Sequence, residues 1–163
     1  MSNTPLTTPE DMPNNATRSR HGLTLERLGI LYARIALGAA FLSAVADRFG
    51  IWGAPGQKNV GWGDFGHFVS YVAEVNSFMP SFTIRSLAWA ATIAEFSLGI
   101  LLILGVWPRW VALGSAILLA MFGIAMAISF GIKSPLDYSV FSASGAAVLL
   151  ALYYSRRDQR QTN

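Results

Sequence analysis

Four long apolar runs, separated by shorter polar segments, constrain this chain more than any other feature of its sequence. They extend over about 25–49, 83–106, 111–132 and 138–154. About 20 apolar residues are enough for a helix to cross the hydrocarbon core of a bilayer, and the fourth run is at the short end of that range. Charged residues are only 13% of the chain, whereas about a quarter is usual in soluble domains. The sequence therefore predicts an all-α integral membrane protein.

The connections between the runs predict how the helices are arranged. The links at 107–110 and 133–137 are short turns, so the helices that they join are expected to be antiparallel neighbours. The first connection is much longer, and apolar residues recur in it at helical spacing, at Trp62, Phe65, Phe68 and Val72. This pattern is typical of an amphipathic helix at a membrane surface. We expect an up-and-down four-transmembrane-helix bundle, with a short interfacial amphipathic helix between the first and second spans and an aromatic cap at 62–75 over its outer mouth.

Basic residues flank the apolar runs and predict the orientation. With the N-terminus inside, the cytoplasmic side carries seven of them, namely Arg18, Arg20, Arg27, Arg109, Arg156, Arg157 and Arg160. The outer side carries four, namely Arg48, Lys58, Arg85 and Lys133. This bias predicts a multi-pass protein of the cell membrane with both termini cytoplasmic. Because the charge flanks membrane helices, it indicates the lipid bilayer as the partner and not nucleic acid.

The polar ends of the chain divide it into three parts. Residues 1–22 are rich in Ser, Thr, Asn and Pro and are predicted to be a disordered cytoplasmic tail. Residues 23–155 form the four-helix membrane domain, and 156–163 form a basic cytoplasmic tail. The start of the chain also loosely resembles a cleaved signal peptide, with an apolar stretch at 28–42 and small residues at 44–46. The long polar lead-in, the charge of Arg34 and the length of the run favour a retained span instead.

Two ionisable residues lie well inside the predicted spans, Arg34 in the first and Glu95 in the second. Each costs at least ~2.5–3.5 kcal/mol at a helix centre if it has no partner. At ~1.5 Å per residue, Arg34 lies nearer to the inner edge than Glu95 does, and an arginine side chain can largely cover the difference in depth. We therefore expect an Arg34–Glu95 ion pair, which either fixes helix register only or lines a polar pocket for a ligand, a quinone or a proton.

Helical periodicity extends this candidate site. At ~100° per residue, one face of the first span carries Arg34, Gly38, Phe41, Val45 and Arg48. On the second span, Glu95 shares a face with Gly99, which would allow close helix approach. The candidate ligand-binding residues are therefore Arg34, Glu95 and Arg48.

Three further polar residues are secondary candidates: Asp47, His67 and Asp64. Asp47 is expected at the outer interface, where its charge reaches water. A histidine beside an aspartate can relay protons. A histidine at the position of His67 is more often a surface residue of a half-buried helix.

Several classes of chemistry are excluded or find no support. The chain has no cysteine, which excludes disulfides, thiol redox chemistry and Cys-ligated metal clusters. Neither histidine lies in a predicted span, where a haem in the bilayer would need its ligands. No metal-ligand spacing and no nucleophile–base arrangement is visible, so no metal is expected and no catalytic residue is assigned.

Two segments carry a resemblance to a known family. Arg-Ile-Ala-Leu-Gly-Ala-Ala-Phe at 34–41, with a basic residue at the end of the same span, is the first. Ala-Glu-Phe-Ser-Leu-Gly-Ile-Leu-Leu-Ile-Leu-Gly at 94–105, followed by the turn at Pro108 and Arg109, is the second. In these features the chain resembles the DoxX-like membrane family over about 25–154. It departs from the family pattern in having Arg48 where a lysine is usual, and in its long aromatic first loop.

The resemblance implies a membrane subunit or accessory protein in quinone-linked redox or oxidative-stress metabolism. The family includes the small membrane subunit of an archaeal thiosulfate:quinone oxidoreductase. A quinone would then be the cofactor, and a peripheral or membrane oxidoreductase the partner, so any enzymatic activity would belong to the complex. Two alternatives stay open. One is a membrane protein that binds or transports a small molecule or lipid, for which four helices would suffice in a homo-oligomer. The other is a structural anchor for a peripheral protein.

Overall fold

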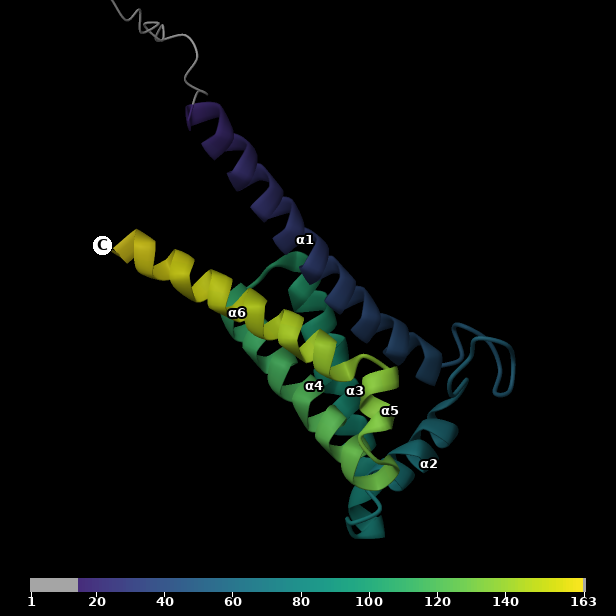
Figure 1. Ribbon diagram of the computed structural model, residues 1–163. Coiled ribbons are helices and arrows are strands. Elements are labelled where there is room, and N and C mark those ends of the chain that lie inside the picture. The colour runs from purple at the N-terminus through teal and green to yellow at the C-terminus, as the bar shows by residue number, and fades with distance from the viewer. Residues whose placement is uncertain (1–14, 163) are drawn as a thin grey trace, which may run out of the picture.

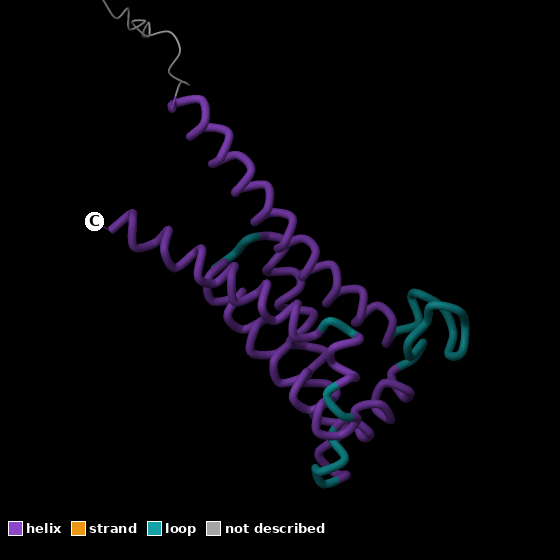
Figure 2. The backbone as a smooth tube through the Cα atoms, in the orientation of Figure 1, coloured by secondary structure: helices purple, strands orange, loops and turns teal. Residues whose placement is uncertain are grey.

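The structure, a computed structural model, describes residues 15–162 and the side chains of 25–160. All the regular secondary structure of this part of the chain is helical, and loops and turns connect the helices (Figures 1 and 2). Its helices are α1 (Asn15–Arg48), α2 (Phe65–Val75), α3 (Ser81–Leu104), α4 (Pro108–Phe130), α5 (Lys133–Asp137) and α6 (Val140–Thr162). The prediction of an all-α membrane fold is confirmed.

The four long helices form a bundle. The most extensive packing joins α4 to α6 and α1 to α3, and smaller contacts between α3 and α4 and between α1 and α6 complete it. The start of α1 and the end of α6 lie at the same end of the bundle, whereas α2 and the loop before it lie at the other (Figure 1). Below, these are called the terminal end and the α2 end.

Within the described chain, three helical segments are long and apolar enough to cross a membrane: Leu25–Arg48, Ser81–Leu104 and Pro108–Phe130. In α6, the apolar part ends near Tyr154 and basic residues follow. From Val140 to Tyr154 this part is about 22 Å long at ~1.5 Å per residue, which is shorter than the hydrocarbon core. A fourth crossing by α6 therefore stays a prediction.

Helix boundaries differ from the predicted ones in three places. α1 begins at Asn15, inside the segment predicted to be a disordered tail, while residues 1–14 lie outside the described residues. α6 continues without a break through residue 156, where the basic tail was expected to begin. The predicted turn at 133–137 is the short helix α5, which packs against both α4 and α6 and buries Pro135.

The aromatic segment of the first connection forms α2. The helix begins after Asp64, whose Oδ1 accepts a hydrogen bond from the backbone N–H of His67 at 2.8 Å, as an N-cap does. Its apolar face, Phe68, Val72 and Val75, is buried. That face packs mainly on α3, with further contacts to α4 and α1.

α2 lies over the end of α1 because α3 is longer at this end of the bundle. Arg48, the last residue of α1, lies opposite Thr92 of α3. From there α3 extends eleven residues further, to Ser81, or about 16 Å at ~1.5 Å per residue. α2 occupies the space beside this extension, and Ser129 of α4 donates a hydrogen bond to the Val75 carbonyl at 2.6 Å. The α2 segment is thus an integral part of the bundle.

Glycines bring α1 and α3 into close contact. A Cβ atom on Gly38 would lie 2.8 Å from the Gly99 carbonyl oxygen and 2.7 Å from Cγ1 of Ile103. Only hydrogen side chains fit where the two backbones approach so closely. The expected close approach at Gly99 is confirmed, and this contact sets the register of the two helices.

Candidate functional site

A buried ion pair links the end of α1 to the middle of α3. Arg48 Nη2 lies 2.6 Å from Glu95 Oε2, and the two side chains are only 3% and 4% exposed. Arg48 Nη1 donates a hydrogen bond to the Thr92 hydroxyl at 2.9 Å, and that hydroxyl donates to the Ala88 carbonyl. Buried charges at such depth need partners of this kind, because each one alone is costly in a low-dielectric interior.

α2 and the loop before it cover the ion pair with aromatic rings. The guanidinium carbon of Arg48 lies 3.7 Å from the centroid of the Phe68 ring and 5.4 Å from that of Trp62. Trp62 and Phe68 pack edge to face with centroids 5.0 Å apart. Cation–π contacts of this kind strengthen when the cation is desolvated, so α2 both shields and stabilises the Arg48 side chain.

The predicted partner of Glu95 was wrong: Arg48, not Arg34, forms the ion pair. Arg34 instead lies at the terminal end of the bundle. Its Nε donates to the Leu102 carbonyl at 2.9 Å and its Nη2 to the Ile103 carbonyl at 3.1 Å, while Nη1 lies 3.4 Å from the hydroxyl oxygen of Tyr154. Arg34 thus donates hydrogen bonds to free carbonyl groups at the C-terminus of α3, where its positive charge also interacts favourably with the helix dipole.

The predicted inward face of α1 is confirmed even though the predicted pair was not. Phe41, Val45 and Arg48 are buried, and Gly38 is packed against α3. Arg34 on the same face is half-buried. The face therefore carries one arginine at each end of the α1–α3 contact.

Asp47 is buried, not exposed at the interface as expected. Its Oδ2 accepts hydrogen bonds from the backbone N–H groups of Gly61 at 3.0 Å and Trp62 at 2.8 Å. Its Oδ1 is buried without a hydrogen-bond partner in the described structure. Asp47 therefore anchors the loop that carries Trp62 over Arg48.

Asp64 and His67 are paired at the start of α2, away from the ion pair. Their side chains are about half exposed or more, and His67 Nδ1 lies 2.9 Å from Asp64 Oδ2. The hydrogen bond from the His67 backbone N–H, followed by that from the His67 ring, lowers the pKa of Asp64 below its usual 3.8. Helix capping accounts for both residues.

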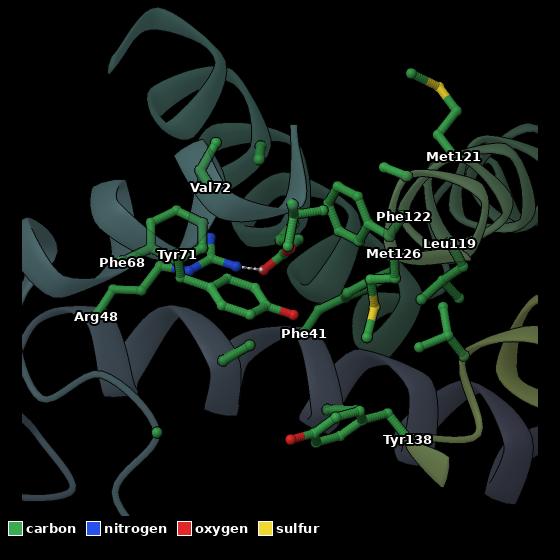
Figure 3. A pocket seen from close by; sticks show the side chains of 18 of the residues that line it. Phe41, Arg48, Phe68, Tyr71, Val72, Leu119, Met121, Phe122, Met126 and Tyr138 are labelled. Carbon is green, nitrogen blue, oxygen red and sulfur yellow. Dashed lines mark hydrogen bonds and ion pairs between the residues drawn. The ribbon is translucent and has the colours of Figure 1, made fainter. Parts of the chain in front are cut away.

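A cavity of about 640 Å³ lies next to the ion pair, inside the half of the bundle that α2 covers (Figure 3). Its wall is mostly apolar, and it includes Arg48 and Glu95 on one side. The helices α1 to α4 and the α5–α6 junction all contribute to it, through Phe41, Trp62, Phe68, Tyr71, Val72, Phe122, Met126 and Tyr138 among others. Ligand pockets are commonly about 300–1,000 Å³, apolar, and supplied with a few polar groups.

Tyr71 adds a neutral polar group to the cavity wall. Figure 3 shows its side chain reaching into the cavity toward Phe41. Burial first, and then the neighbouring Tyr138 and Glu74, raise the pKa of Tyr71 above its usual 10.0. The phenol therefore keeps its proton at physiological pH and can donate a hydrogen bond to a ligand.

Sequence reasoning missed Tyr71, Thr92 and Tyr138 at this site. Thr92 lies three residues before Glu95, hence on the same helix face, so this spacing was a usable signal. Tyr71 and Tyr138 come from segments whose docking positions have no local sequence signal. Among the described residues, no group of three or more His, Asp or Glu side chains is placed to hold a metal ion.

Comparison with known proteins identifies the family of the chain. The family model described as DoxX matches residues 29–129, from α1 through α4, which is 101 of the 163 residues. Comparison with curated proteins and with solved structures finds no match. The matched segment contains Arg48, Glu95 and most of the cavity wall. On the strength of this match, together with the helical membrane fold, the chain belongs to the DoxX family.

Proposed function

We propose that this DoxX-family membrane protein binds a quinone, as a membrane subunit or accessory protein in quinone-linked redox or oxidative-stress metabolism. The cavity beside Arg48 and Glu95 carries the proposal. A quinone has a flat ring with two carbonyl acceptors and apolar substituents. An apolar, aromatic-lined cavity with a tyrosine hydroxyl and a fixed charge pair on its wall suits such a molecule.

Each polar residue has a definite role in this proposal. Tyr71 donates a hydrogen bond to a quinone carbonyl, since its hydroxyl keeps its proton and reaches into the cavity. The Arg48–Glu95 pair polarises one side of the pocket, and Phe68 holds the guanidinium in place. Electrons would come from a partner oxidoreductase, because the chain has no cysteine and so no thiol couple of its own.

Quinone binding is testable by removing the proposed donor. We expect the purified protein in lipid nanodiscs to bind a decyl-tailed dimethoxybenzoquinone, measured by quenching of tryptophan fluorescence. Tyr71→Phe should weaken this binding about two- to tenfold, because one hydrogen bond is worth about 0.5–1.5 kcal/mol and 1.4 kcal/mol is a factor of ten.

The control is Tyr153→Phe. Tyr153 stacks edge to face on Tyr154 and is absent from the cavity wall, so its variant should bind like the wild type. Mass spectrometry of protein purified with native lipids identifies the natural occupant. A retained phospholipid or other small molecule, with no quinone and no binding of the added quinone, would favour the alternative of a lipid or small-molecule carrier.

The proposed setting is the cell membrane, crossed four times, with both termini cytoplasmic. The charges at the two ends support this orientation: the terminal end carries seven of the flanking basic residues, Arg18, Arg20, Arg27, Arg109, Arg156, Arg157 and Arg160, and the α2 end carries four, Arg48, Lys58, Arg85 and Lys133. Basic residues concentrate on the cytoplasmic side of membrane proteins. α6, with its short apolar part, would complete the fourth crossing together with α5.

Cysteine labelling tests this orientation. The chain has no cysteine of its own, so an introduced cysteine is the only residue of the chain that a maleimide labels. In intact cells, a membrane-impermeant maleimide should label Lys58→Cys without permeabilisation. Arg157→Cys should be labelled only after the cells are permeabilised, because residue 157 lies on the cytoplasmic side in the proposed orientation. Labelling of both variants from outside would mean that α6 does not cross, and the reverse pattern would invert the topology.

A further inference from the structure

Along one side of α1, only small side chains separate the cavity from the surroundings of the bundle. Ala40 and Ala44 line the cavity there with the smallest side chains other than glycine, and Ala40 is exposed. A second hollow, of about 420 Å³, is lined by the same two alanines and Trp62, by the exposed residues Ser43 and Trp52, and, toward the loop before α2, by Asp47 and Asn59. The two spaces therefore adjoin over one stretch of α1.

The wall also reaches the surface at the α5–α6 junction. Tyr138, at the α5–α6 junction, lines the cavity but is 75% exposed. Tyr71 of α2 is close enough to Tyr138 for the two phenols to interact electrostatically. Ala40 and Tyr138 are thus lining residues that are also exposed at the surface of the bundle.

The depth of Ala40 determines what enters the cavity beside it. Ala40 lies eight residues before the end of α1, or about 12 Å at ~1.5 Å per residue, and inside the segment Leu25–Arg48 that can span the membrane. At that depth the surroundings are hydrocarbon, because the apolar core of a bilayer is about 30 Å thick. A molecule that enters here therefore comes from lipid, not from water.

We propose that the cavity opens sideways into the bilayer over Ala40 and Ala44, and that it selects quinones with a long apolar tail, which runs out through this opening. The inference rests on the proposed quinone binding and adds the substrate class and the entry route. The ring binds near Tyr71 and the ion pair, while the tail lies against the alanines of α1. An apolar tail in this position stays in contact with lipid chains and loses none of its favourable environment.

The test compares a tailed quinone with a tail-less one on a variant that closes the opening. Ala40→Trp should weaken binding of the decyl-tailed dimethoxybenzoquinone tenfold or more. Binding of the tail-less dimethoxy-methylbenzoquinone should change less than twofold. The matched control is Ala39→Trp, since Ala39 is the exposed neighbour on α1 that lines neither hollow. Ala40→Leu, with about a threefold expected loss for the tailed quinone, replaces Ala40→Trp if that protein is not monodisperse.

The possible outcomes separate the opening from the site itself. If the Ala40 variant weakens both quinones equally, or weakens neither, the lateral opening at α1 is wrong although quinone binding stands. An equal loss in the Ala39 variant would overturn the opening in the same way. If the wild-type protein binds neither quinone, the proposed function itself fails, and the inference that rests on it fails too.

Discussion

Replacing Arg48 by alanine is expected to lower the free energy of unfolding by about 3–5 kcal/mol, because it leaves the Glu95 carboxylate buried without its partner. Glu95→Ala should lower the free energy of unfolding by a similar amount, because it leaves the Arg48 guanidinium buried without its partner. The double variant Arg48→Met/Glu95→Leu should recover most of the loss, since apolar residues of similar volume often replace a buried ion pair at little cost. SDS titration monitored by circular dichroism measures these differences.

A double-mutant cycle distinguishes this pair from the one that the sequence suggested. Arg48→Ala and Glu95→Ala should show a coupling energy of about 2 kcal/mol or more, within the range for residues in contact. Arg34 lies fourteen residues earlier on α1, or about 21 Å at ~1.5 Å per residue. Arg34→Ala and Glu95→Ala should therefore be additive within about 0.5 kcal/mol. Strong coupling between Arg34 and Glu95 would contradict the register described above.

Gly38→Leu is expected to destabilise the protein by about 1–3 kcal/mol, since it forces extra atoms into a filled contact. Even its Cβ would lie 2.8 Å from the backbone carbonyl of Gly99, and backbone on both sides cannot move aside cheaply. The helices would have to separate, which would also displace the nearby Arg48–Glu95 pair. Unfolding by SDS titration measures the loss.

The matched control for Gly38→Leu is Gly29→Leu on the same helix. A Cβ at Gly29 would meet nothing within 4 Å. Leucine also favours helix over glycine by up to about 1 kcal/mol, so this variant should be neutral or slightly stabilised. If both glycine variants behaved alike, the close approach of α1 and α3 would not be the contact that sets their register.

The membrane helices could be predicted from sequence because their signal is local. An apolar run of sufficient length predicts a span wherever it packs, and α1, α3 and α4 follow the predicted runs within a few residues at most ends. The inward face of α1 was predictable for the same reason, because it depends only on 3.6-residue periodicity. Neither inference needed the position of a second helix.

The pairing of charges depended on helix register, which the sequence does not contain. Assuming level helix ends placed Arg34 nearest to Glu95. In the structure, the contact between Gly38 and Gly99 sets α3 further toward the α2 end, so that Arg48 reaches Glu95. Asp47 was expected to reach water at the end of α1, yet the loop before α2 packs on it and buries it. The docking of α2, and with it the cavity, arises from contacts between segments far apart in the sequence.

Photo-crosslinking tests most directly the central claim that the cavity beside Arg48 and Glu95 is the quinone site. The probe is a decyl-tailed benzoquinone with a diazirine on its ring, irradiated with the protein in lipid nanodiscs and mapped by mass spectrometry. We predict labels on cavity residues of α2 and α4, such as Tyr71, Phe122 and Met126, and their loss when excess unlabelled quinone competes. Labels confined to lipid-facing residues such as Ile117 and Ile128, exposed on α4, and unaffected by competitor would contradict the claim.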